Sequence, residues 1–300
     1  MRKKRRIVIY LFVLALLAGM SVIWILGRKA ENPEQNNTET VSGNMEVHFL
    51  DAGQGDSILV RSENENLLID AGTNEDEEMV VSYLKEQGVE KLDYVIATHP
   101  HIDHIGGMDA VIETFPVGTC FLPEETYDTE SFQEVLAALD EADVKIRHPE
   151  FMENYEIGSG RFVFITPDSE KQYEDINDSS LGIRLTNGPH SFLLCGDISQ
   201  RIEKEILKSG ISIRSDVMKL NHHGSRDANS WKFLKAASPS FVVITCGTRN
   251  EFGHPHEKVM KRVEKLGAGV FRTDLQGTIV FESDGETLKC STGPEEGSRK

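Results

Sequence analysis

Basic residues are scarce in this chain, which has 32 lysines and arginines against 49 aspartates and glutamates and a formal charge of −17. Five of the basic residues form the run 2–6, so the remainder of the chain carries a formal charge of −22. Such a charge disfavours broad, sequence-independent binding of nucleic acid, because that binding depends on many Lys and Arg contacts to phosphates. It does not exclude a nuclease whose metal ions engage a single phosphate.

Signatures of several enzyme classes are also missing. The chain has no Gly-x-Ser-x-Gly elbow and no Walker A sequence, and Gly53-Gln54-Gly55 lacks the third glycine of a dinucleotide-binding turn. Covalent serine catalysis and nucleotide-cofactor redox chemistry therefore lack support. The four cysteines include no Cys-x-x-Cys pair, which argues against a cysteine zinc knuckle, and Cys195 and Cys246 lie in apolar runs typical of buried free thiols.

Only one long apolar run is present, from Ile7 to Gly27, so the chain cannot itself form a conducting channel. About 20 apolar residues suffice to span a hydrocarbon core as a helix, and the basic flank 1–6 is expected to stay in the cytoplasm. We expect a single-pass transmembrane signal-anchor at 7–27, a linker at 28–44, an extracellular domain at 45–290 and a disordered tail at 291–300. A cleaved signal peptide, which would yield a secreted protein, is the alternative.

The most informative stretch is 98–107, Thr-His-Pro-His-Ile-Asp-His-Ile-Gly-Gly, directly after the apolar run 92–97. His99, His101, Asp103 and His104 place four metal-competent side chains within six residues. On an extended strand end, residues 99, 101 and 103 would share one face. A turn at Asp103 would then let Asp103 and His104 reach a second point. Imidazole and carboxylate ligands for two adjacent ions suit zinc or manganese.

This string resembles the metal-binding signature of the metallo-β-lactamase superfamily. Further motifs narrow the resemblance to the hydrolase domain of ComEC-type DNA-uptake proteins and their free-standing relatives, over roughly residues 45–285. These motifs are Phe-Leu-Asp-Ala-Gly-Gln-Gly-Asp-Ser at 49–57, Leu-Leu-Ile-Asp-Ala-Gly at 67–72, Leu-Cys-Gly-Asp at 194–197, Leu-Asn-His-His-Gly-Ser at 220–225, Asn-Glu-Phe-Gly-His at 250–254, and Arg-Thr-Asp at 272–274 with Gly277. The resemblance implies an α+β fold, an αββα four-layer sandwich with active-site loops at one sheet edge. The order of short β-rich and helical runs agrees with it, and Asn187-Gly188 signals a hairpin turn.

The resemblance also implies which residues bind metal. The expected ligands are His99, His101, Asp103, His104, Asp197 and His222. Asp197 follows the apolar run 192–195, where a carboxylate would bridge two cations; an N-cap for the next helix is the alternative. We favour His222 over His223 as the late ligand by motif position.

Other residues are expected to act on the substrate or to support the ligands. His223 would face the substrate as an acid or a hydrogen-bond donor, His254 would line the pocket, and Asp103, His223 and His254 are the expected catalytic residues. The expected supporting residues are Asp70, Asp51, Gln54, Asp56 and Ser225. Asp70 would accept a hydrogen bond from a ligating imidazole or from the loop backbone and so fix the ring's orientation.

The chain departs from the superfamily at one ligand position. Many members carry another histidine between the first cluster and the bridging aspartate, where this chain offers only His148 and His190 in loop-like contexts. The nearest family feature is the segment 177–180, Asn-Asp-Ser-Ser, which has Ser179 where an amide is usual. This predicts that the first ion has fewer protein ligands and is held more loosely.

The chemistry that follows is hydrolysis. Two divalent ions can bind a bridging water and lower its pKa, and the bound hydroxide can then attack a phosphoryl or acyl centre whose charge the ions stabilise. The ComEC-like motifs favour a phosphodiester substrate: DNA, RNA or a small nucleotide. An acyl hydrolase acting on a lactone, lactam or thioester is one alternative, because the superfamily that the chain resembles uses the same metal site for phosphodiester and acyl substrates. An anchored nucleic-acid-binding module with weak catalysis, associated with DNA uptake, is the other.

Overall fold

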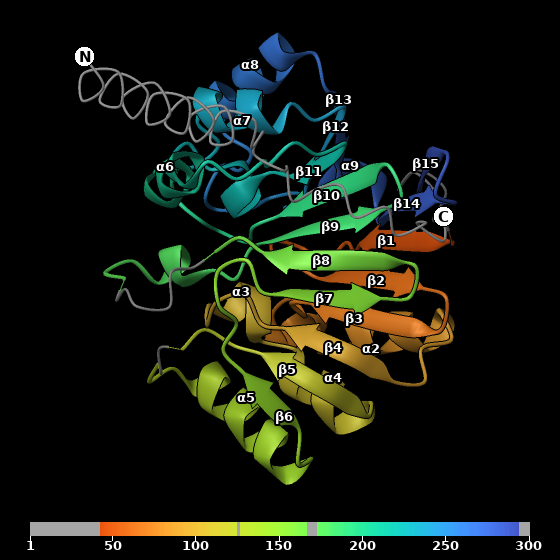
Figure 1. Ribbon diagram of the computed structural model, residues 1–300. Helices are drawn as coiled ribbons and strands as arrows, with labels where there is room; N and C mark the ends of the chain where they lie inside the picture. The colour runs from red at the N-terminus through yellow and green to blue at the C-terminus, as the bar shows by residue number, and fades with distance from the viewer. Residues whose placement is uncertain (1–42, 125–126, 167–172, 294–300) are drawn as a thin grey trace, which may run out of the picture. The chain divides into compact units, whose positions relative to one another are not determined.

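The computed structural model describes residues 43–124, 127–166 and 173–293. Within these residues, an eight-stranded and a seven-stranded sheet lie against each other (Figure 1). The expected signal-anchor at 7–27 lies outside the described residues, as does nearly all of the linker. None of the helices in the described ranges is long and apolar enough to cross a membrane.

The first sheet is mixed, with the strand order β15-β14-β1-β2-β3-β4-β5-β6. Its strands are β1 (Met45–Phe49), β2 (Ile58–Ser62), β3 (Glu65–Ile69), β4 (Leu92–Ile96), β5 (Val117–Phe121), β6 (Lys145–Arg147), β14 (Ile279–Ser283) and β15 (Leu288–Thr292). β3 to β6 run parallel, whereas β1, β2, β14 and β15 pair antiparallel. β15 runs two residues beyond the expected domain end at 290.

The second sheet has the order β13-β12-β11-β10-β9-β8-β7. Its strands are β7 (Asn154–Ile157), β8 (Gly160–Phe164), β9 (Ile183–Asn187), β10 (His190–Leu194), β11 (Val217–Lys219), β12 (Phe241–Ile244) and β13 (Gly269–Arg272). β7 to β10 form an antiparallel meander, and β10 to β13 are parallel. The expected combination of hairpins and helical crossovers is confirmed.

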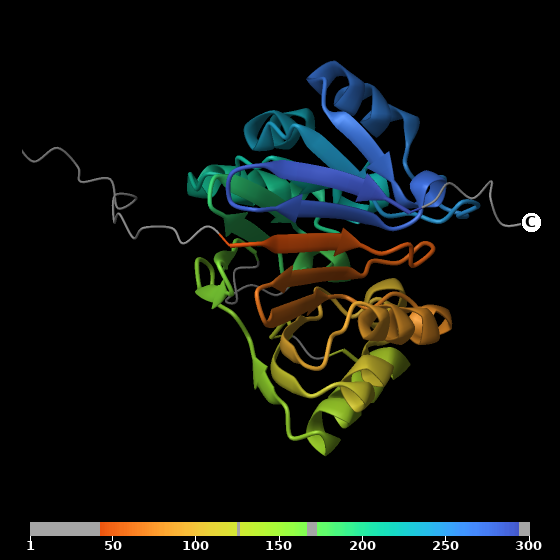
Figure 2. The same ribbon diagram turned by 90° about the vertical axis from the view of Figure 1, so that its right-hand side faces the viewer.

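Helices cover the outer face of each sheet, as Figures 1 and 2 show. The longer helices are α2 (Glu77–Glu86), α4 (Met108–Thr114) and α5 (Glu130–Glu141) on the first sheet, and α6 (Gln200–Ser209), α7 (Trp231–Ala237) and α8 (Glu257–Leu266) on the second. Short helical turns are η1 (Asn74–Asp76), α3 (Ile102–Ile105), η2 (Ile176–Ser179), η3 (Asn221–Gly224) and α9 (Thr273–Gln276). The described residues thus form the expected four layers, helix–sheet–sheet–helix.

The central strands read as continuous apolar runs because both of their faces are buried. In β10, Phe192 and Leu194 point into the core between the sheets. Leu193, between them, points into the layer beneath α6 to α8. Alternation of side chains along a strand therefore fills two cores at once, and three apolar clusters separate the four layers.

The hairpin predicted from Asn187-Gly188 is confirmed between β9 and β10, with Gly188 at φ 56°. Asn187 is fully buried, and its amide nitrogen donates to the carbonyl oxygen of Gly43 at 2.9 Å and to Oγ of Ser283 at 3.1 Å. Its amide oxygen accepts from Ser159 at 3.1 Å. Asn187 therefore joins the two sheets at the edge where β10 begins.

The cysteines are free thiols, and Cys120, Cys195 and Cys246 are fully buried. The expectation of buried free thiols at Cys195 and Cys246 is confirmed. Burial raises the pKa of the Cys120 and Cys246 thiols to about 12, so neither carries the thiolate that reacts or binds metal. The chemistry of this chain must therefore be sought elsewhere.

One edge of the sandwich collects the polar ends of six strands. The strands β1, β3, β4, β10, β11 and β12 all finish there. The loops that carry the expected ligands, their supporting residues and His254 each follow one of these ends, so the topology brings together residues far apart in sequence. Ligand-binding residues commonly gather at the carboxyl ends of parallel strands.

Candidate metal centre

The loop after β4 carries the first histidine cluster. His99 lies in a bend after β4, and His101 is the N-cap of α3 with φ −76° and ψ 145°. The helix begins at Ile102, so Asp103 and His104 stand on its first turn; the expectation of an extended strand end through residue 103 is wrong. This helical turn brings His104 back beside His99, with 4.1 Å between their ring centroids.

Asp70, at the end of β3, holds this loop in place. Its carboxylate accepts hydrogen bonds from the backbone nitrogen of Thr98 at 2.8 Å, from the Thr98 hydroxyl at 2.7 Å and from Nδ1 of His104 at 2.7 Å. With Nδ1 donating to Asp70, His104 must present Nε2 to the centre of the site. A carboxylate behind a ligating imidazole fixes the tautomer in this way.

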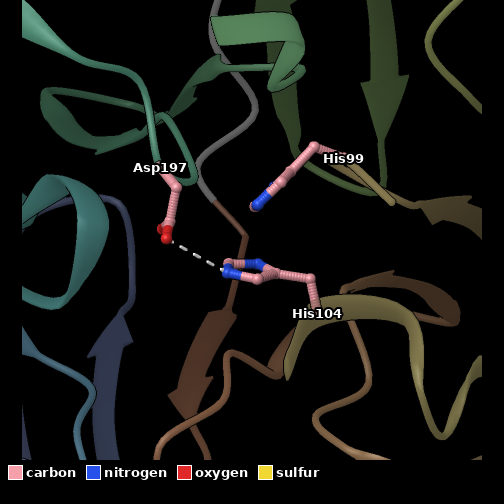
Figure 3. Close-up of side chains that lie close together, drawn as sticks. All are labelled: His99, His104 and Asp197. Atoms are coloured by element: carbon pink, nitrogen blue, oxygen red, sulfur yellow. Dashed lines mark ion pairs between the residues drawn. The ribbon is translucent and has the colours of Figure 1, made fainter. Parts of the chain in front are cut away.

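The loop after β10 brings Asp197 to the same point. Gly196, at φ 54°, turns the chain, and the backbone nitrogen of Asp197 donates to Oγ of Ser180 at 3.1 Å. The Asp197 carboxylate is nearly completely buried, and its Oδ2 lies 3.4 Å from Nε2 of His104. Figure 3 shows His99, His104 and Asp197 directed toward a common centre. Ser199, not Asp197, is the N-cap of α6, so the capping alternative does not account for Asp197.

The loop after β11 supplies the histidine pair from an unusual backbone. His222 and His223 both lie in the left-handed region, at φ 51°, and Gly224 follows at φ 83°. Left-handed geometry costs roughly 1–2 kcal/mol for each non-glycine residue. Gly224 is also needed for close approach, because a Cβ there would lie 2.7 Å from Cβ of Pro255.

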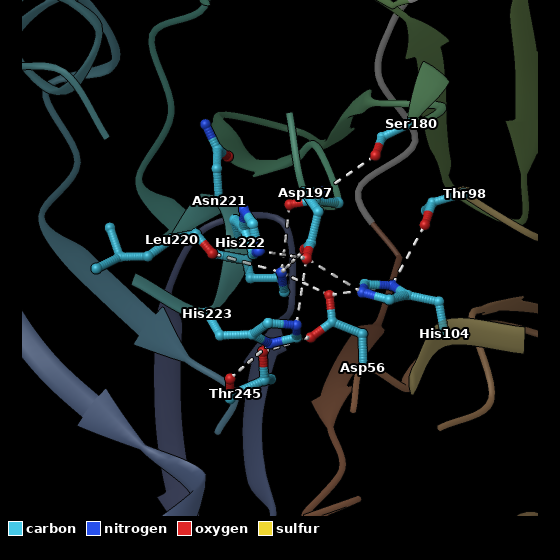
Figure 4. Close-up of polar contacts among 12 residues, drawn as sticks. Asp56, Thr98, His104, Ser180, Asp197, Leu220, Asn221, His222, His223 and Thr245 are labelled. Atoms are coloured by element: carbon cyan, nitrogen blue, oxygen red, sulfur yellow. Dashed lines mark hydrogen bonds and ion pairs between the residues drawn. The ribbon is translucent and has the colours of Figure 1, made fainter. Parts of the chain in front are cut away.

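With this backbone, His223 and not His222 lies nearer the carboxylates, whereas motif order favoured His222. His223 is buried; its Nδ1 donates to the carbonyl oxygen of Thr245 at 2.9 Å, and its Nε2 lies 3.3 Å from Asp197 (Figure 4). Nε2 of His223 also lies 3.4 Å from Asp103. His222 is partly exposed, and its Nε2 lies 3.7 Å from Asp197. The distances therefore favour His223 over His222 as the candidate metal ligand, and His222 lines the cavity.

Buried polar atoms without a hydrogen-bond partner indicate where a cation fits. Among the described residues, Nε2 of His104, Nε2 of His223 and Oδ1 of Asp197 are buried and have no hydrogen-bond partner. Unsatisfied buried polar atoms are uncommon and costly in folded proteins. Asp103, His104 and His223 offer ligand atoms within 4.8 Å of one another. Two imidazoles and a carboxylate, with Asp197 beside them, match the ligands that zinc and manganese accept.

A second ligand group adjoins the first. His99, His104 and Asp197 also offer ligand atoms within 4.8 Å of one another. Nε2 of His99 lies 3.0 Å from Nδ1 of His101, so the two imidazoles converge. Ser180 Oγ lies 3.3 Å from the other nitrogen of His99 and helps to orient that ring. The donors fit a second ion that shares Asp197 with the first.

Buried carboxylates shift the pKa values of the histidines in the site. Burial lowers the pKa of His104, but the negative charges of Asp197 and Asp70 outweigh burial and raise that pKa well above its usual value. Burial likewise opposes the charge on His223, yet Asp197 and Asp56 raise its pKa to about 10. Burial and the charge of His104 hold the pKa of His99 well below its usual value. The electrostatic potential around His104 and His223 is therefore negative.

Asp56 and Lys219 form a buried pair beneath these ligands. Nζ of Lys219 lies 2.5 Å from Oδ2 of Asp56 and 3.8 Å from Oδ1 of Asp197. Oδ1 of Asp56 accepts from the hydroxyl of Thr245 at 2.5 Å and lies 3.5 Å from Nδ1 of His223. Sequence reasoning missed Lys219, whose only signal is a cation at the end of an apolar strand.

Glu203 on α6 holds the loop that carries the histidine pair. Its carboxylate accepts from the backbone nitrogens of Asn229, at 2.5 Å, and Ser230, at 2.8 Å, and from the side chain of Asn221 at 3.0 Å. Asn229 in turn bonds both backbone groups of Asn221 at 2.9 and 2.8 Å. These buried bonds fix the backbone on either side of the left-handed segment. The sequence gives no sign of them, since Glu203 lies on an otherwise ordinary amphipathic helix.

The remaining expected residues divide into two groups. Gln54 and His254 line the cavity over the ligands, with 3.4 Å between Nε2 of Gln54 and Nδ1 of His254. Asp51 is exposed and does not line that cavity. Ser225 is buried and accepts from the backbone of Asp227 at 3.3 Å, so the structure does not bring it to the cavity either.

The histidines that were considered for the missing ligand position are not part of the centre. Nδ1 of His148 lies 3.1 Å from the carbonyl oxygen of Leu122, and His190 begins β10, at the opposite end of that strand from Asp197. Asn177 from η2 does reach the cavity, and its amide oxygen is buried without a partner among the described residues.

Replacement of Lys219 tests whether this cation holds the carboxylates together. Lys219→Met leaves Asp56 buried without its cation, and breaking such a pair costs about 3–5 kcal/mol. We expect the free energy of urea unfolding, measured by tryptophan fluorescence with chelator present, to fall by that amount. Adding Asp56→Asn should recover part of the loss, because the uncompensated charge is removed.

The control for this prediction is Lys261→Met, because Lys261 pairs with Glu257 on the exposed face of α8. An exposed pair of this kind contributes little to stability. A Lys219 variant as stable as the Lys261 variant would show that the buried pair does not support the site.

The family and the relatives of the chain agree with this geometry. The family model described as "Metallo-beta-lactamase superfamily" matches residues 50–244, more than half of the chain. ComE operon protein 3 of Bacillus subtilis (strain 168) is 29% identical over 80% of this chain and 33% of its own length. Competence protein ComA of Neisseria gonorrhoeae is 32% identical over 78% of this chain and 32% of its own length. The chain therefore spans about a third of the length of these curated relatives.

Solved structures share the fold. CmlA, a diiron beta-hydroxylase from Streptomyces venezuelae, superposes with a TM-score of 0.52 at 13% identity, covering 77% of this chain and 53% of that protein. The metallo-beta-lactamase fold protein YhfI from Bacillus subtilis superposes with a TM-score of 0.50 at 18% identity, covering 76% and 95%. At such identities the likeness concerns the fold alone. With the family model, the strand-end ligands and the four layers in agreement, the chain belongs to the metallo-beta-lactamase superfamily.

Proposed function

We propose that this protein is a metal-dependent phosphodiesterase that acts on a nucleic acid or a nucleotide. The observation that carries the proposal is the convergence of three buried ligand atoms without a hydrogen-bond partner, on His104, His223 and Asp197, beside a cavity that His223 and Asp197 line. Leaving buried polar atoms without a hydrogen bond costs free energy. A cation that meets them would stabilise both the loop and the site.

The residues divide naturally between two ions. His99, His101 and Asp197 would hold one, and Asp103, His104, His223 and Asp197 the other, with zinc or manganese as the candidates. When bound, two such ions supply positive charge for the phosphoryl oxygens and lower the pKa of the attacking water. The chain itself would orient the ligands through Asp70 and Thr245, which fix the rings of His104 and His223.

The side chains around the cavity mouth support a phosphodiester. Besides the ligands, the cavity is lined by the uncharged polar groups of Gln54 and Asn177, and by His222 and His254. Amide and imidazole N–H groups can donate to non-bridging phosphoryl oxygens as negative charge develops on them. The relative from Neisseria gonorrhoeae is named a competence protein, which also favours nucleic acid over an acyl substrate.

Hydrolysis of bis(p-nitrophenyl) phosphate tests the reaction. The full-length protein in detergent should hydrolyse it with zinc or manganese and lose the activity in chelator. Asp103→Ala should reduce the rate about a hundredfold or more, because it removes a ligand of the reacting centre. An ester and a β-lactam reporter run in parallel; turnover of either of these without phosphodiester turnover would make the protein an acyl hydrolase and refute the proposal.

Metal content of two neighbouring variants tests the ligand assignment. His223→Asn should reduce the ions measured by elemental analysis after dialysis from two to one per chain, because it removes a buried ligand. His222→Asn is the matched control and should keep both ions, since its imidazole lies on the cavity side. The reverse pattern would restore His222 to the ligand set that motif order suggested.

We also propose that the domain lies outside the cell, anchored by the apolar run 7–27. The basic flank 2–6 before that run supports this orientation. Protease added to intact cells should then remove the domain without lysis, and the domain should be recovered with the membrane fraction. Protection until lysis would place it inside, and recovery from the medium would show that the run is cleaved.

A further inference from the structure

A larger hollow adjoins the cavity over the metal ligands. The ligand cavity has a volume of about 280 Å³ and the neighbouring hollow about 850 Å³. Both are lined by Gln54, Ile102 and Phe252, so the hollow opens directly onto the candidate centre. A group attached to a phosphate held at the centre can therefore extend into the hollow. Its lining comes from η1, α3, the start of α5 and the loop before α8.

Charge in the hollow is negative. The four carboxylates of Glu75, Glu130, Glu134 and Glu251 line it, against the single cation of Arg249. Glu130 and Glu134 lie one turn apart on α5, so their charges act on the same space. These carboxylates would repel a phosphate that entered the hollow. Proteins that hold nucleic-acid backbones instead contact them with Lys and Arg.

The boundary between the two spaces is apolar. Ile102 is 56% exposed and Phe252 is 62% exposed, although both are large hydrophobic residues. The ring of Phe252 stacks on His254, with 5.6 Å between ring centroids and 21° between planes, which leaves its other face open. An open aromatic face beside an apolar side chain suits a flat, uncharged ring, and bases stack on such faces in nucleic-acid-binding proteins.

We propose that this hollow binds the base and sugar of a phosphodiester whose phosphate lies at the metal centre, and that it excludes a second phosphate. The inference rests on the proposed function and narrows its substrate class. The base stacks on Phe252 beside Ile102, and the glutamates face the uncharged remainder of the nucleoside. The substrate is then a short phosphodiester, with one nucleoside and no further phosphate on this side, and not a strand laid along the groove.

Grooves that track a single strand combine aromatic platforms with positive charge. In this hollow the aromatic ring of Phe252 lies beside glutamates, so the charge has the opposite sign from that of a strand-binding groove. Salt dependence therefore distinguishes the two. Salt weakens binding that depends on attraction to phosphates, whereas it relieves repulsion between the glutamates and a second phosphate.

Equilibrium binding to the metal-loaded, full-length protein in detergent tests the inference, with methyl phosphate, thymidine 5′-phosphate and thymidine 3′,5′-bisphosphate as calorimetric probes. Thymidine 5′-phosphate should bind about tenfold more tightly than methyl phosphate, the effect of one stacked base. The bisphosphate should bind more weakly than the monophosphate at low salt, and added salt should narrow the gap. Whichever of its phosphates is at the centre, the other must enter the hollow.

Two variants assign the effects to named groups. Phe252→Ala should bring the ratio of the methyl phosphate and thymidine 5′-phosphate dissociation constants close to one, and Phe252→Trp should preserve the ratio. Glu130→Gln combined with Glu134→Gln should remove most of the discrimination against the bisphosphate. Equal dissociation constants of methyl phosphate and thymidine 5′-phosphate for the wild-type protein would overturn the inference. So would a bisphosphate that binds more tightly than thymidine 5′-phosphate and loses affinity as salt is added.

The outcome is separable from that of the proposed function. If the protein hydrolyses bis(p-nitrophenyl) phosphate but binds methyl phosphate and thymidine 5′-phosphate equally tightly, the proposed reaction stands and the hollow is not a nucleoside site. If thymidine 5′-phosphate binds about tenfold more tightly than methyl phosphate but no phosphodiester is hydrolysed, the proposed reaction is wrong and the nucleoside site is retained.

Discussion

Repulsion among buried carboxylates is the constraint on which the site depends. Asp56, Asp70 and Asp197 are almost fully buried within one edge of the sandwich, and Asp103 joins them from α3. The protein offsets this charge with one permanent cation, Lys219, and with imidazoles that the carboxylates drive toward protonation. Divalent ions would neutralise the rest and meet the unpaired atoms, so metal binding and stability of this edge are coupled.

Backbone strain is concentrated in the same place. His222 and His223 adopt left-handed geometry in succession, which persists only when surrounding contacts over-determine it. Those contacts are the buried bonds from Glu203 and Asn229 and the close approach of Pro255 to Gly224. The left-handed backbone places His223 beside Asp103 and Asp197 and His222 at the cavity, so two consecutive residues occupy different parts of the site.

The four layers and most ligands were predictable because they follow from local patterns and motif order. Apolar runs ending in Asp70, His99 and Asp197 mark strand ends, and Asn187-Gly188 marks the hairpin. The order of His222 and His223 was not predictable, because it depends on backbone angles fixed by distant residues. Lys219 was missed for a similar reason: a buried cation is recognisable only when the carboxylates from other strands are placed around it. The onset of α3 at Ile102 likewise depends on tertiary bonds to the loop.

The two sheets are joined differently at their two ends. At one end Asn187 connects the β9–β10 turn to β14 and to the residues before β1 through neutral hydrogen bonds. At the other, ligands from the first sheet, such as His104, face ligands from the second, such as Asp197 and His223. Neutral hydrogen bonds therefore join the sheets at one edge, where neither pH nor metal should affect them. At the other edge the contact between the sheets would depend on bound metal, so a chelator should loosen that edge while the Asn187 contacts keep the sheets in register.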